Sequence, residues 1–422
     1  MLDFSDQPYQ YFPPKFSRFW STLLLYHNRV RHLPGTQRIA EVVTTGHDTL
    51  LQQIKPGDRL VFLPNHSTHA DAAIFLESLR QVGISSLMMA AYDVFLRGRA
   101  HRFTMQRMGA FAVDRDGSCP KPMKQALATL DRGQHALTIF PEGNVYLTND
   151  RITPFMDGAA FIALKAQQAL LKDESKSGRI LAVPVSIKVT HLTNARRRIA
   201  QRFEPLGQQL GVTTDFHAEP VKAVYEAGEI ALHRNLKQRG LDVPEAANLG
   251  SLIQQAAINV LDRLEAKLEI TPKPKDTPLD RVRTARRLIH EVRIDPDRAV
   301  DHAAAATWAD EAMLAFRIAS YPMGYAAEHP TIDRLGETVE KLEEDLLTKM
   351  PPPFANRHAT VHFNAPLDVR DLLTAHPKLR AAVGAFTSQT EAAVQAGLDH
   401  LNHHNPHPGS QLWSEKNLAP GQ

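Results

Sequence analysis

The chain has 422 residues, of which 43% are hydrophobic and 23% are charged. This composition is that of a folded globular protein, and it excludes a collagen-like or an intrinsically disordered chain. Lysine and arginine number 49 against 46 aspartate and glutamate residues, so the formal net charge is only +3. A protein that binds nucleic acid by neutralising phosphates needs a larger positive excess, and we therefore expect no nucleic-acid partner.

The single cysteine, Cys119, cannot form a disulfide within the chain, which favours a reducing, cytoplasmic compartment. The first residues, MLDFSDQPYQYFPPKF, place acidic residues and prolines where a secretory signal has positive charge and an apolar stretch. No run of 18 or more apolar residues is present, whereas a bilayer-spanning helix needs about 20. We expect a cytoplasmic protein that is soluble or peripheral to a membrane.

An amphipathic helix is predicted over Lys15–Val30, because Phe19, Trp20 and Leu23 recur at helical spacing. Such a helix could pack on the core of the protein. Alternatively, it could lie in a membrane interface with the tryptophan as an anchor.

Short β-rich apolar runs alternate with helical stretches between residues 59 and 189. The predicted strands are Leu60–Leu63, Ser86–Met89, Ala110–Val113, Ala136–Phe140 and Ile180–Val189, and the predicted helices are Ala72–Gln81, Pro122–Arg132 and Gly158–Leu171. This alternation predicts an α/β fold with a mixed, largely parallel sheet flanked by helices. In such sheets functional residues gather at the carboxyl ends of the strands.

Strand signals nearly vanish after residue 195, which predicts a large helical insertion. Its clearest helices are Leu252–Leu268, Pro278–Val292, Ala303–Ile318 and Ile332–Leu347. The run ATVHFNAPLDV then predicts one strand and turn over Ala359–Val369, which could return the chain to the sheet. A last helix over Pro377–Asn402 precedes a polar tail that we expect to be disordered.

The best candidate for chemistry lies in RLVFLPNHSTHADAAIFLESL, where a predicted strand is followed by a turn and a helix. In one continuous helix, residues five apart are rotated by about 140°, so His66 and Asp71 can meet only if His66 lies in the turn. A neutral imidazole accepts a proton from a hydroxyl, and a carboxylate on its other nitrogen fixes its tautomer. The pair is a general base, and the attacking hydroxyl could belong to the substrate, since the nearest protein candidate is only Ser67.

Two other interpretations of these residues remain open. Asp71 could serve only as a helix cap, with His66 as an ordinary turn residue. Alternatively, His66, His69 and Asp71 could bind zinc or iron, as in a metallohydrolase, although no further ligand cluster accompanies them.

At these residues the sequence resembles the glycerolipid acyltransferases, which include glycerol-3-phosphate and lysophosphatidic acid acyltransferases. NHSTHAD resembles the His-x4-Asp motif of that family, and GAFAVDR, FPEG and VPVSI resemble its second, third and fourth blocks. The matching residues are His66, Asp71, Gly109, Arg115, Phe140, Pro141, Glu142, Gly143 and Pro184. Four short motifs in the family's order, within Leu51–Val189, are far more specific than any one of them.

The resemblance implies transfer of a fatty acyl group from an acyl-CoA or acyl-carrier-protein thioester to a hydroxyl of a lysolipid or glycerol phosphate. His66 would be the base and Asp71 its orienting partner, with no metal and no cofactor, and the other matched residues would bind substrate. The implied organisation is an N-terminal amphipathic helical segment over 1–50, the acyltransferase domain over 51–195, the helical insertion over 196–355, and a returning strand, C-terminal helix and tail over 356–422. The protein would lie on the cytoplasmic face of a membrane.

Simple chemistry suggests a role for three of the matched residues. The planar donors of Arg115, at a strand end, suit a phosphate. The turn in FPEG places Glu142 at the carboxyl end of a strand, where it can bind acceptor hydroxyls or neighbouring backbone amides. Pro184 is better suited to shaping an edge or a pocket wall than to touching the reaction.

Some positions depart from the family. Asn144 and Val145 follow FPEG where the family usually has threonine and arginine, and Met156 stands where it often has lysine. These changes remove cations expected near the acceptor phosphate, which indicates a different acceptor. FPEGNV is also similar to tafazzin-like transacylases, so transfer between a phospholipid and a lysophospholipid is an alternative.

A basic cluster, Arg196, Arg197, Arg198 and Arg202, could attract anionic lipid headgroups.

Overall fold

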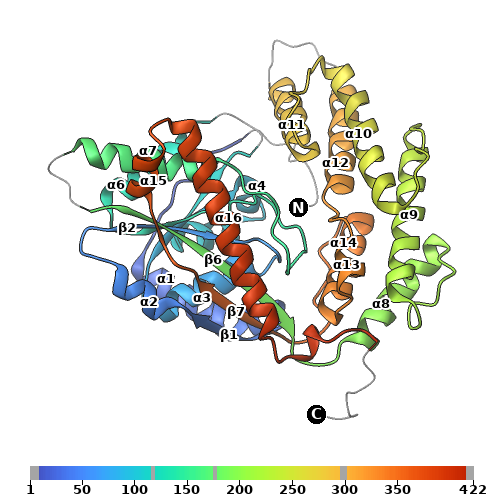
Figure 1. The fold of residues 1–422 in the computed structure, drawn as a ribbon, viewed down its shortest axis with the longest axis horizontal. Coiled ribbons are helices and arrows are strands. Elements are labelled where there is room, and N and C mark those ends of the chain that lie inside the picture. The colour runs from blue at the N-terminus through green and yellow to red at the C-terminus, as the bar shows by residue number, and fades with distance from the viewer. Residues whose placement is uncertain (1–8, 116–118, 174–177, 295–301, 415–422) are drawn as a thin grey trace.

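The alternating apolar runs of the sequence form one mixed sheet in the computed structural model, which describes residues 9–115, 119–173, 178–294 and 302–414 (Figure 1). Within these residues the strands are β1 Ile39–Thr45, β2 Arg59–Pro64, β3 Ser86–Ala91, β4 Ala110–Val113, β5 Ala136–Thr138, β6 Ile180–His191, β7 Arg357–Phe363 and β8 Leu367–Asp368. Their order across the sheet is β1-β7-β6-β2-β5-β3-β4, and β8 also pairs with β6. The expected α/β class with a largely parallel mixed sheet is confirmed.

Five strands point in one direction, because the neighbours in β6-β2-β5-β3-β4 pair in parallel. Strand β7 is antiparallel to β6 and parallel to the edge strand β1. The carboxyl ends of β2, β3, β4, β5 and β6 therefore meet at one edge of the sheet. Loops at this edge can converge on a common site.

Helices cover both faces of the sheet, and a separate group of helices stands beside it (Figure 1). The helices of the sheet domain are α1 Arg18–His27, α2 His47–Gln53, α3 Asp71–Val82, α4 Tyr92–Phe95, α5 Arg99–Arg107, α6 Lys121–Arg132, α7 Gly158–Lys172, α15 Val369–Ala375 and α16 Leu379–His403. The inserted helices are α8 Arg196–Leu210, α9 Pro220–Gln238, α10 Leu249–Leu268, α11 Pro278–Ile294, α12 His302–Ala319, α13 Tyr325–Glu328 and α14 Ile332–Leu347. The insertion leaves the sheet after β6, at the edge where the five carboxyl ends meet, and returns at β7.

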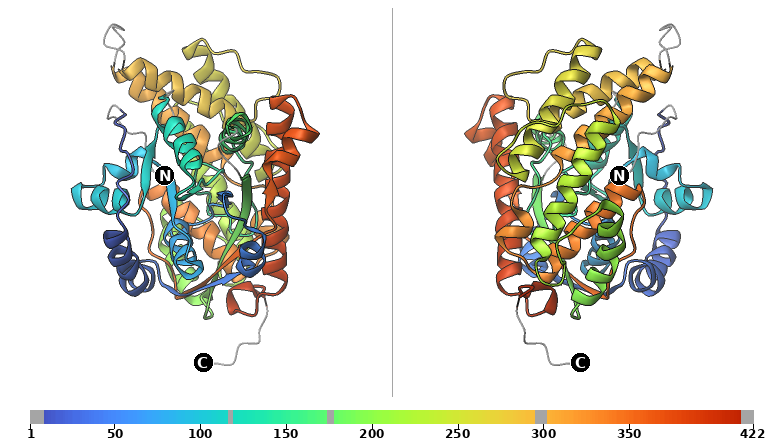
Figure 2. Two further views of the ribbon diagram at one scale, coloured as in Figure 1. Left: turned by 90° about the vertical axis from the view of Figure 1, so that its left-hand side faces the viewer. Right: turned by 90° about the vertical axis from the view of Figure 1, so that its right-hand side faces the viewer.

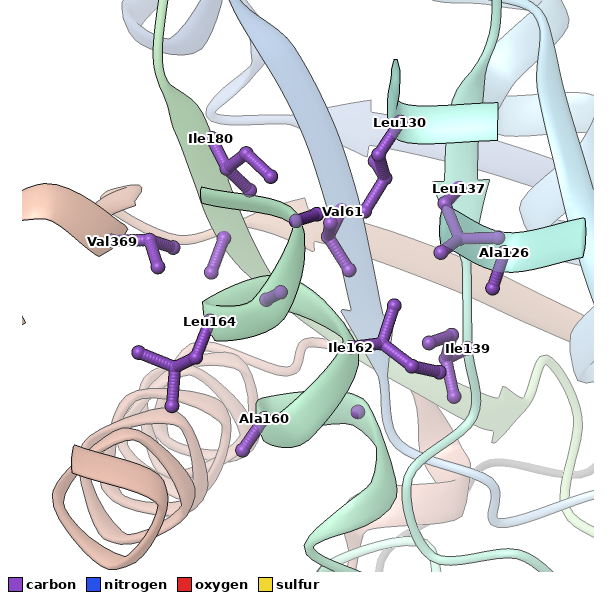
Figure 3. Packing of buried hydrophobic residues seen from close by; sticks show 14 of the residues in the cluster. Val61, Ala126, Leu130, Leu137, Ile139, Ala160, Ile162, Leu164, Ile180 and Val369 are labelled. Carbon is purple, nitrogen blue, oxygen red and sulfur yellow. The ribbon is translucent and has the colours of Figure 1, made fainter. Parts of the chain in front are cut away.

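Strand β2 is at the centre of the core because its side chains alternate between two apolar layers. Val61 and Leu63 pack on one face with residues of α6, α7 and α16, as Figure 3 shows for the α7 side. Leu60 and Phe62 pack on the other face with residues of α3. A strand that is buried on both faces has a continuous run of apolar residues. For this reason RLVFLP could be predicted as a strand from the sequence.

The N-terminal segment differs from the prediction for residues 1–50. Helix α1 ends at His27, shorter than the predicted Lys15–Val30, and continues as π-helical turns over Asn28–Thr36. Strand β1 then joins the sheet beside β7, so the sheet begins before residue 51. An edge strand of mixed polarity such as IAEVVTT lacks the apolar alternation that identifies a strand in sequence.

The polar tail was expected to be disordered, but its described part is held on the insertion. The backbone N–H of Trp413 donates to Pro330 (2.8 Å), and the N–H of Ile332 donates to Gln411 (3.0 Å). Residues 415–422 lie outside the described part of the chain. The tail is ordered by tertiary contacts, which its own composition does not reveal.

Much of the basic cluster that was considered for lipid headgroups is engaged within the protein. The guanidinium of Arg198 donates to the carbonyl of Phe354 (3.1 Å), and that of Arg202 contacts Glu343 (2.6 Å). Arg196 donates to the carbonyl of Trp413 (2.9 Å). These three arginines tie the first inserted helix to the rest of the fold, so the structure does not support a lipid-binding role for them.

A buried polar network joins the insertion to β6 and to the loop after β5. Asp333 accepts hydrogen bonds from Thr190 Oγ1 (2.6 Å) and the His191 backbone N–H (3.1 Å), and the hydroxyl of Tyr325 donates to Glu337 (2.5 Å). Burial, together with the negative charge of Asp150, raises the pKa of Glu337 to about 8. Glu337 is therefore protonated in the folded protein at a pH where it is ionised in the unfolded chain.

This pKa predicts a loss of stability as the pH rises. Between the ordinary pKa of 4.5 and about 8, the folded state holds a proton that the unfolded state has released. The Glu337 carboxyl should then lower the free energy of unfolding by up to about 1.4 kcal/mol per pH unit. Glu337→Gln should flatten this dependence, relative to the wild type, in urea denaturation at pH 5 to 8. An unchanged slope in Glu337→Gln would contradict the assignment.

Candidate active site

The predicted pair of His66 and Asp71 forms at the carboxyl end of β2. His66 lies in the turn after the strand, and Asp71 is the first residue of α3. His66 Nδ1 and Asp71 Oδ2 are 3.1 Å apart, within hydrogen-bonding distance. The imidazole is 21% exposed and the carboxylate is fully buried, so the ring can meet a substrate while its partner stays inside the protein.

Asp71 is fixed by the turn that it closes. Its Oδ2 also accepts from the backbone N–H of Thr68 (2.8 Å), and its Oδ1 accepts from the Thr68 hydroxyl (2.7 Å). Asp71 is thus more than a helix cap, because the same carboxylate that orders the turn also contacts the imidazole. These bonds keep the carboxylate oriented toward the ring.

This geometry determines which ring nitrogen can act as a base. A carboxylate only accepts hydrogen bonds, so His66 Nδ1 carries the proton that Asp71 binds. The other nitrogen, Nε2, then presents its lone pair. If Nε2 takes up a proton, the buried negative charge of Asp71 stabilises the imidazolium that results.

Glu142 binds the backbone of the site, which is the second of the two roles considered for it. Its Oε1 accepts from the backbone N–H of His66 (2.6 Å), and its Oε2 accepts from the N–H of Thr153 (2.9 Å) and from the Thr153 hydroxyl. The residue is 2% exposed. Burial raises the pKa of Glu142, and the hydrogen bonds from Thr153 and His66 oppose that effect. Glu142 thus positions His66 through the backbone, and its expected contact with the acceptor stays a prediction.

The rest of the FPEG turn surrounds the imidazole and Arg115. The Phe140 ring lies against the His66 ring, with centroids 4.4 Å apart. Pro141 accepts a hydrogen bond from the N–H of Met156 (2.8 Å). Gly143 has φ +75°, a conformation that favours glycine, and its carbonyl accepts from Arg115 Nη1 (3.1 Å). These residues form one constellation at the carboxyl edge of the sheet.

Arg115 follows β4 and points toward this turn. Besides Gly143, its guanidinium donates to Asn144 Oδ1 (2.7 Å) and to Asp93 Oδ1 (3.3 Å), and its side chain is 20% exposed. Two sheet loops therefore hold the arginine in a fixed orientation. A planar cation held in this way suits an anionic oxygen group.

Gly109 does not join the site, although it was expected to bind substrate. It precedes β4, whereas Arg115 follows that strand, so Gly109 lies at the opposite edge of the sheet. Its φ is +96°, and a Cβ there would lie 2.9 Å from Leu87 Cδ2. The glycine permits a close turn into the strand, which is a structural role.

Pro184 lies inside the sheet, in register with Leu63 on the neighbouring strand β2. Its carbonyl accepts from the N–H of Asn364, just after β7 ends at Phe363. Proline has no backbone N–H to donate. At Pro184 this side of the strand faces the gap between β7 and β8, where the sheet requires no hydrogen-bond donor. Pro184 thus supports the wall next to β2, and it is not at an edge of the sheet.

The metal-binding interpretation is not supported by the geometry. His69 Nε2 contacts Glu344 Oε2 on α14 at 2.8 Å, and it does not join His66 and Asp71. Across the described ranges, no three His, Cys, Asp or Glu side chains are grouped so that they could hold a metal ion. Ser67 is 2% exposed and its hydroxyl is 3.4 Å from Asn149 Oδ1, so it is not presented as a nucleophile.

Comparison with known families agrees with this constellation. Residues 45–188, about a third of the chain, match the family model described as Acyltransferase. This segment is an acyltransferase domain. It spans β2 to β6, which are the five co-directional strands whose carboxyl ends carry the site. No curated protein matches the chain.

The acyltransferase domain contains supporting residues that the sequence analysis missed. Thr68 fixes Asp71, and Thr153 fixes Glu142. Thr68 is one of the unspecified positions inside the His-x4-Asp motif, and Thr153 lies outside every matched block. The signal for Thr68 was present, since a threonine three residues before an aspartate commonly forms a local hydrogen-bonded turn. No such signal exists for Thr153, because it lies eleven residues from its partner in an irregular loop.

Replacement of Glu142 tests its positioning role. Glu142→Ala should lower the free energy of unfolding by about 1–3 kcal/mol for each backbone amide, at His66 and Thr153, that loses its partner. Glu142→Gln should lose less, because its carbonyl oxygen can still accept one of the two bonds. Urea denaturation of the purified variants measures both values, and equal stability of Glu142→Ala and the wild type would contradict the role.

Proposed function

We propose that the protein transfers a fatty acyl group from an acyl-CoA or acyl-carrier-protein thioester to a hydroxyl of a lysophospholipid or glycerol phosphate. The observation that carries this proposal is the contact of 3.1 Å between His66 Nδ1 and Asp71 Oδ2 within an acyltransferase domain. It leaves Nε2 as a base at a partly exposed position. Transfer to a substrate hydroxyl then needs no protein nucleophile.

The reaction follows from the position of this base. The acceptor hydroxyl donates a hydrogen bond to His66 Nε2, and its oxygen attacks the thioester carbonyl carbon while its proton passes to Nε2. Asp71 stabilises the imidazolium as the tetrahedral oxyanion forms. The oxyanion then collapses, the carbon–sulfur bond breaks, and the thiolate takes the proton from Nε2. The products are the acylated acceptor and a free thiol.

The acceptor headgroup would lie near Arg115. The guanidinium follows β4, and its Nη1 contacts the turn that includes Glu142, which itself binds the His66 backbone. A phosphate bound there would lie beside the same turn whose Glu142 positions His66. This arrangement supports a phosphorylated acceptor.

We also propose that the protein works at a membrane surface and docks through α1. Across the described ranges no helix is both long enough and apolar enough to span a bilayer. On α1, however, the side chains of Phe19, Leu23 and Tyr26 are 72%, 50% and 64% exposed, and the Trp20 ring packs on the exposed ring of Phe103 of α5. Figure 2 shows α1 and α5 projecting on the same side of the molecule. An exposed aromatic and aliphatic face favours a membrane interface.

Charge supports the same docking face. The exposed arginines on α1, on its π-helical continuation and near α5 include Arg18, Arg29, Arg31, Arg97 and Arg99, of which Arg29 lies 3.9 Å from Glu77. Each cation near an anionic lipid surface contributes about 1 kcal/mol. The combination of apolar side chains and cations fits the anionic surface of a cytoplasmic leaflet.

Loss of the base should abolish most acyl transfer. In a His66→Ala variant, the rate of thiol release from an acyl-CoA with lysophosphatidate should fall by about 10²–10⁴-fold, because no group accepts the hydroxyl proton. His69→Ala is the matched control, since this histidine contacts Glu344 instead, and it should keep nearly full activity. Near-normal transfer by His66→Ala, with the fold verified by circular dichroism, would reject the assignment.

The same assay distinguishes the transacylase alternative. If the wild type acylates lysolipids only from a phospholipid and releases no thiol from an acyl thioester, the donor is a phospholipid. Mass spectrometry of the acylated product with an isotopically labelled donor gives the answer directly.

Removal of the apolar face should weaken membrane binding. In a Phe19→Ser, Leu23→Ser double variant, affinity for anionic vesicles in a flotation assay should fall at least tenfold, because each buried side chain contributes about 1.5–3 kcal/mol. Leu171→Ser on α7 is the control, since Leu171 is 61% exposed but lies on another helix. Equal binding by the double variant and the control would contradict docking through α1.

A further inference from the structure

Helix α11 of the insertion packs against the acyltransferase domain at the turn that follows β5. Figure 1 shows α11 on the side of the insertion that faces the sheet. From the domain, Arg115, Gly143, Asn144 and Met156 line a narrow cavity, and from the insertion it is lined by Leu279, Val282, Arg283, Arg286 and Phe316. Two parts of the chain that are far apart in sequence therefore share the walls of one cavity beside the site.

The contact uses one defined face of α11. Leu279, Val282, Arg283 and Arg286 are spaced by three or four residues, which places them along a single helical face. One turn further, His290 Nε2 is 3.8 Å from Asp114 Oδ2, next to Arg115. Val282 is 1% exposed. This face is thus a packed interface, held at both ends against the loop after β4 and the turn after β5.

Among the described residues, the cavity is lined by three guanidinium groups and by no carboxylate. Two acidic residues outside this lining contact the arginines: Asp93 is 3.3 Å from Arg115, and Asp280 is 2.9 Å from Arg283 on the same helix. Arg286 is only 5% exposed, and its Nη1 lies 3.6 Å from Met313 Sδ. Three guanidinium groups that line one small cavity supply planar sets of donors suited to an anion with several oxygen atoms, such as a phosphate.

The insertion adds positive charge beside the domain's own Arg115. Asn144 and Met156, two of the three positions noted in the sequence as uncharged, line the cavity, where the domain contributes Arg115 as a cation. Arg283 and Arg286 arrive from α11 at the same place. Burial raises the pKa of the Tyr146 phenol, and the nearby positive charge of Arg283 opposes that rise. The side chain of Arg283 is thus directed toward the segment that follows FPEG.

We propose that α11 completes the binding pocket for the phosphate monoester of the acceptor, with Arg283 and Arg286 acting together with Arg115. The inference rests on the proposed acyl transfer and assigns its preference for a phosphorylated acceptor to the insertion. The cavity holds about 30 Å³, room for roughly two waters. A phosphate needs more space than this. The flexible side chain of Met156 is the part of the cavity wall that can move. It packs close to Gly143, since its Sδ lies 3.0 Å from the position that a Cβ on Gly143 would occupy.

Kinetics with matched acceptors test this pocket. Arg283→Gln should raise KM for lysophosphatidate about tenfold or more, because a charge-assisted hydrogen bond to the phosphate is lost. The variant should leave the kinetics with a monoacylglycerol of the same chain, and KM for the acyl-CoA, within about twofold of the wild type. Arg287→Gln is the control, since Arg287 is the next residue on α11 but its side chain is 54% exposed and outside the cavity. Arg283→Lys should recover part of the loss.

Three results would overturn the proposal. The first is an equal effect of Arg283→Gln on the phosphorylated and the uncharged acceptor, and the second is an effect no larger than that of Arg287→Gln. The third is a rise in KM for the acyl-CoA alone, which would place a phosphate of the donor in the pocket.

Binding without turnover separates this proposal from the proposed function. Titration calorimetry of the full-length His66→Ala variant should show binding of glycerol 3-phosphate and none of glycerol, and Arg283→Gln in that background should weaken the binding about tenfold or more. If the wild type transfers no acyl group to any acceptor but this binding depends on Arg283, the enzymatic proposal fails and the anion pocket stands. If transfer occurs and neither binding nor KM depends on Arg283, the anion pocket fails and the enzymatic proposal stands.

Discussion

The bond between Asp71 and His66 is the constraint on which the candidate active site depends. A buried carboxylate at the first residue of α3 binds the turn through Thr68 and the imidazole through Nδ1, so one side chain sets both the backbone and the base. Glu142 holds the other side of the turn through the His66 backbone N–H. Two buried carboxylates thus fix the position of one imidazole, and the free energy of burying them is offset by the hydrogen bonds that they accept.

The direction of the strands explains why separate sequence motifs meet. Strands β2, β5, β3 and β4 are parallel neighbours, so the loops that follow them reach the same edge of the sheet. His66, the FPEG turn and Arg115 each follow one of these strands. The insertion begins after β6 at the same edge, and α11 is therefore able to reach the turn after β5 and line a cavity with it.

Several parts of this arrangement could be predicted from the residues themselves. Strand β2, the turn between it and α3, and the inserted helices α10, α11, α12 and α14 have strong local patterns, and their predicted bounds differ from the observed ones by only a few residues. The edge strand β1 was missed because its pairing with β7 involves residues more than 300 positions away. Gly109 was misplaced for a related reason: a motif shows which residues recur together, and it does not show which end of a strand each occupies.

The sequence by itself determined the α/β alternation, the pairing of His66 with Asp71 and the arginine at a strand end, because each follows from spacing along a few residues of chain. Tertiary structure alone decided that Glu142 binds backbone amides, that Pro184 lies inside the sheet, and that the arginines of α11 stand beside Arg115. Such contacts join segments separated by tens to hundreds of residues. They depend on how whole helices and strands pack, and the local propensities of a segment do not determine that packing.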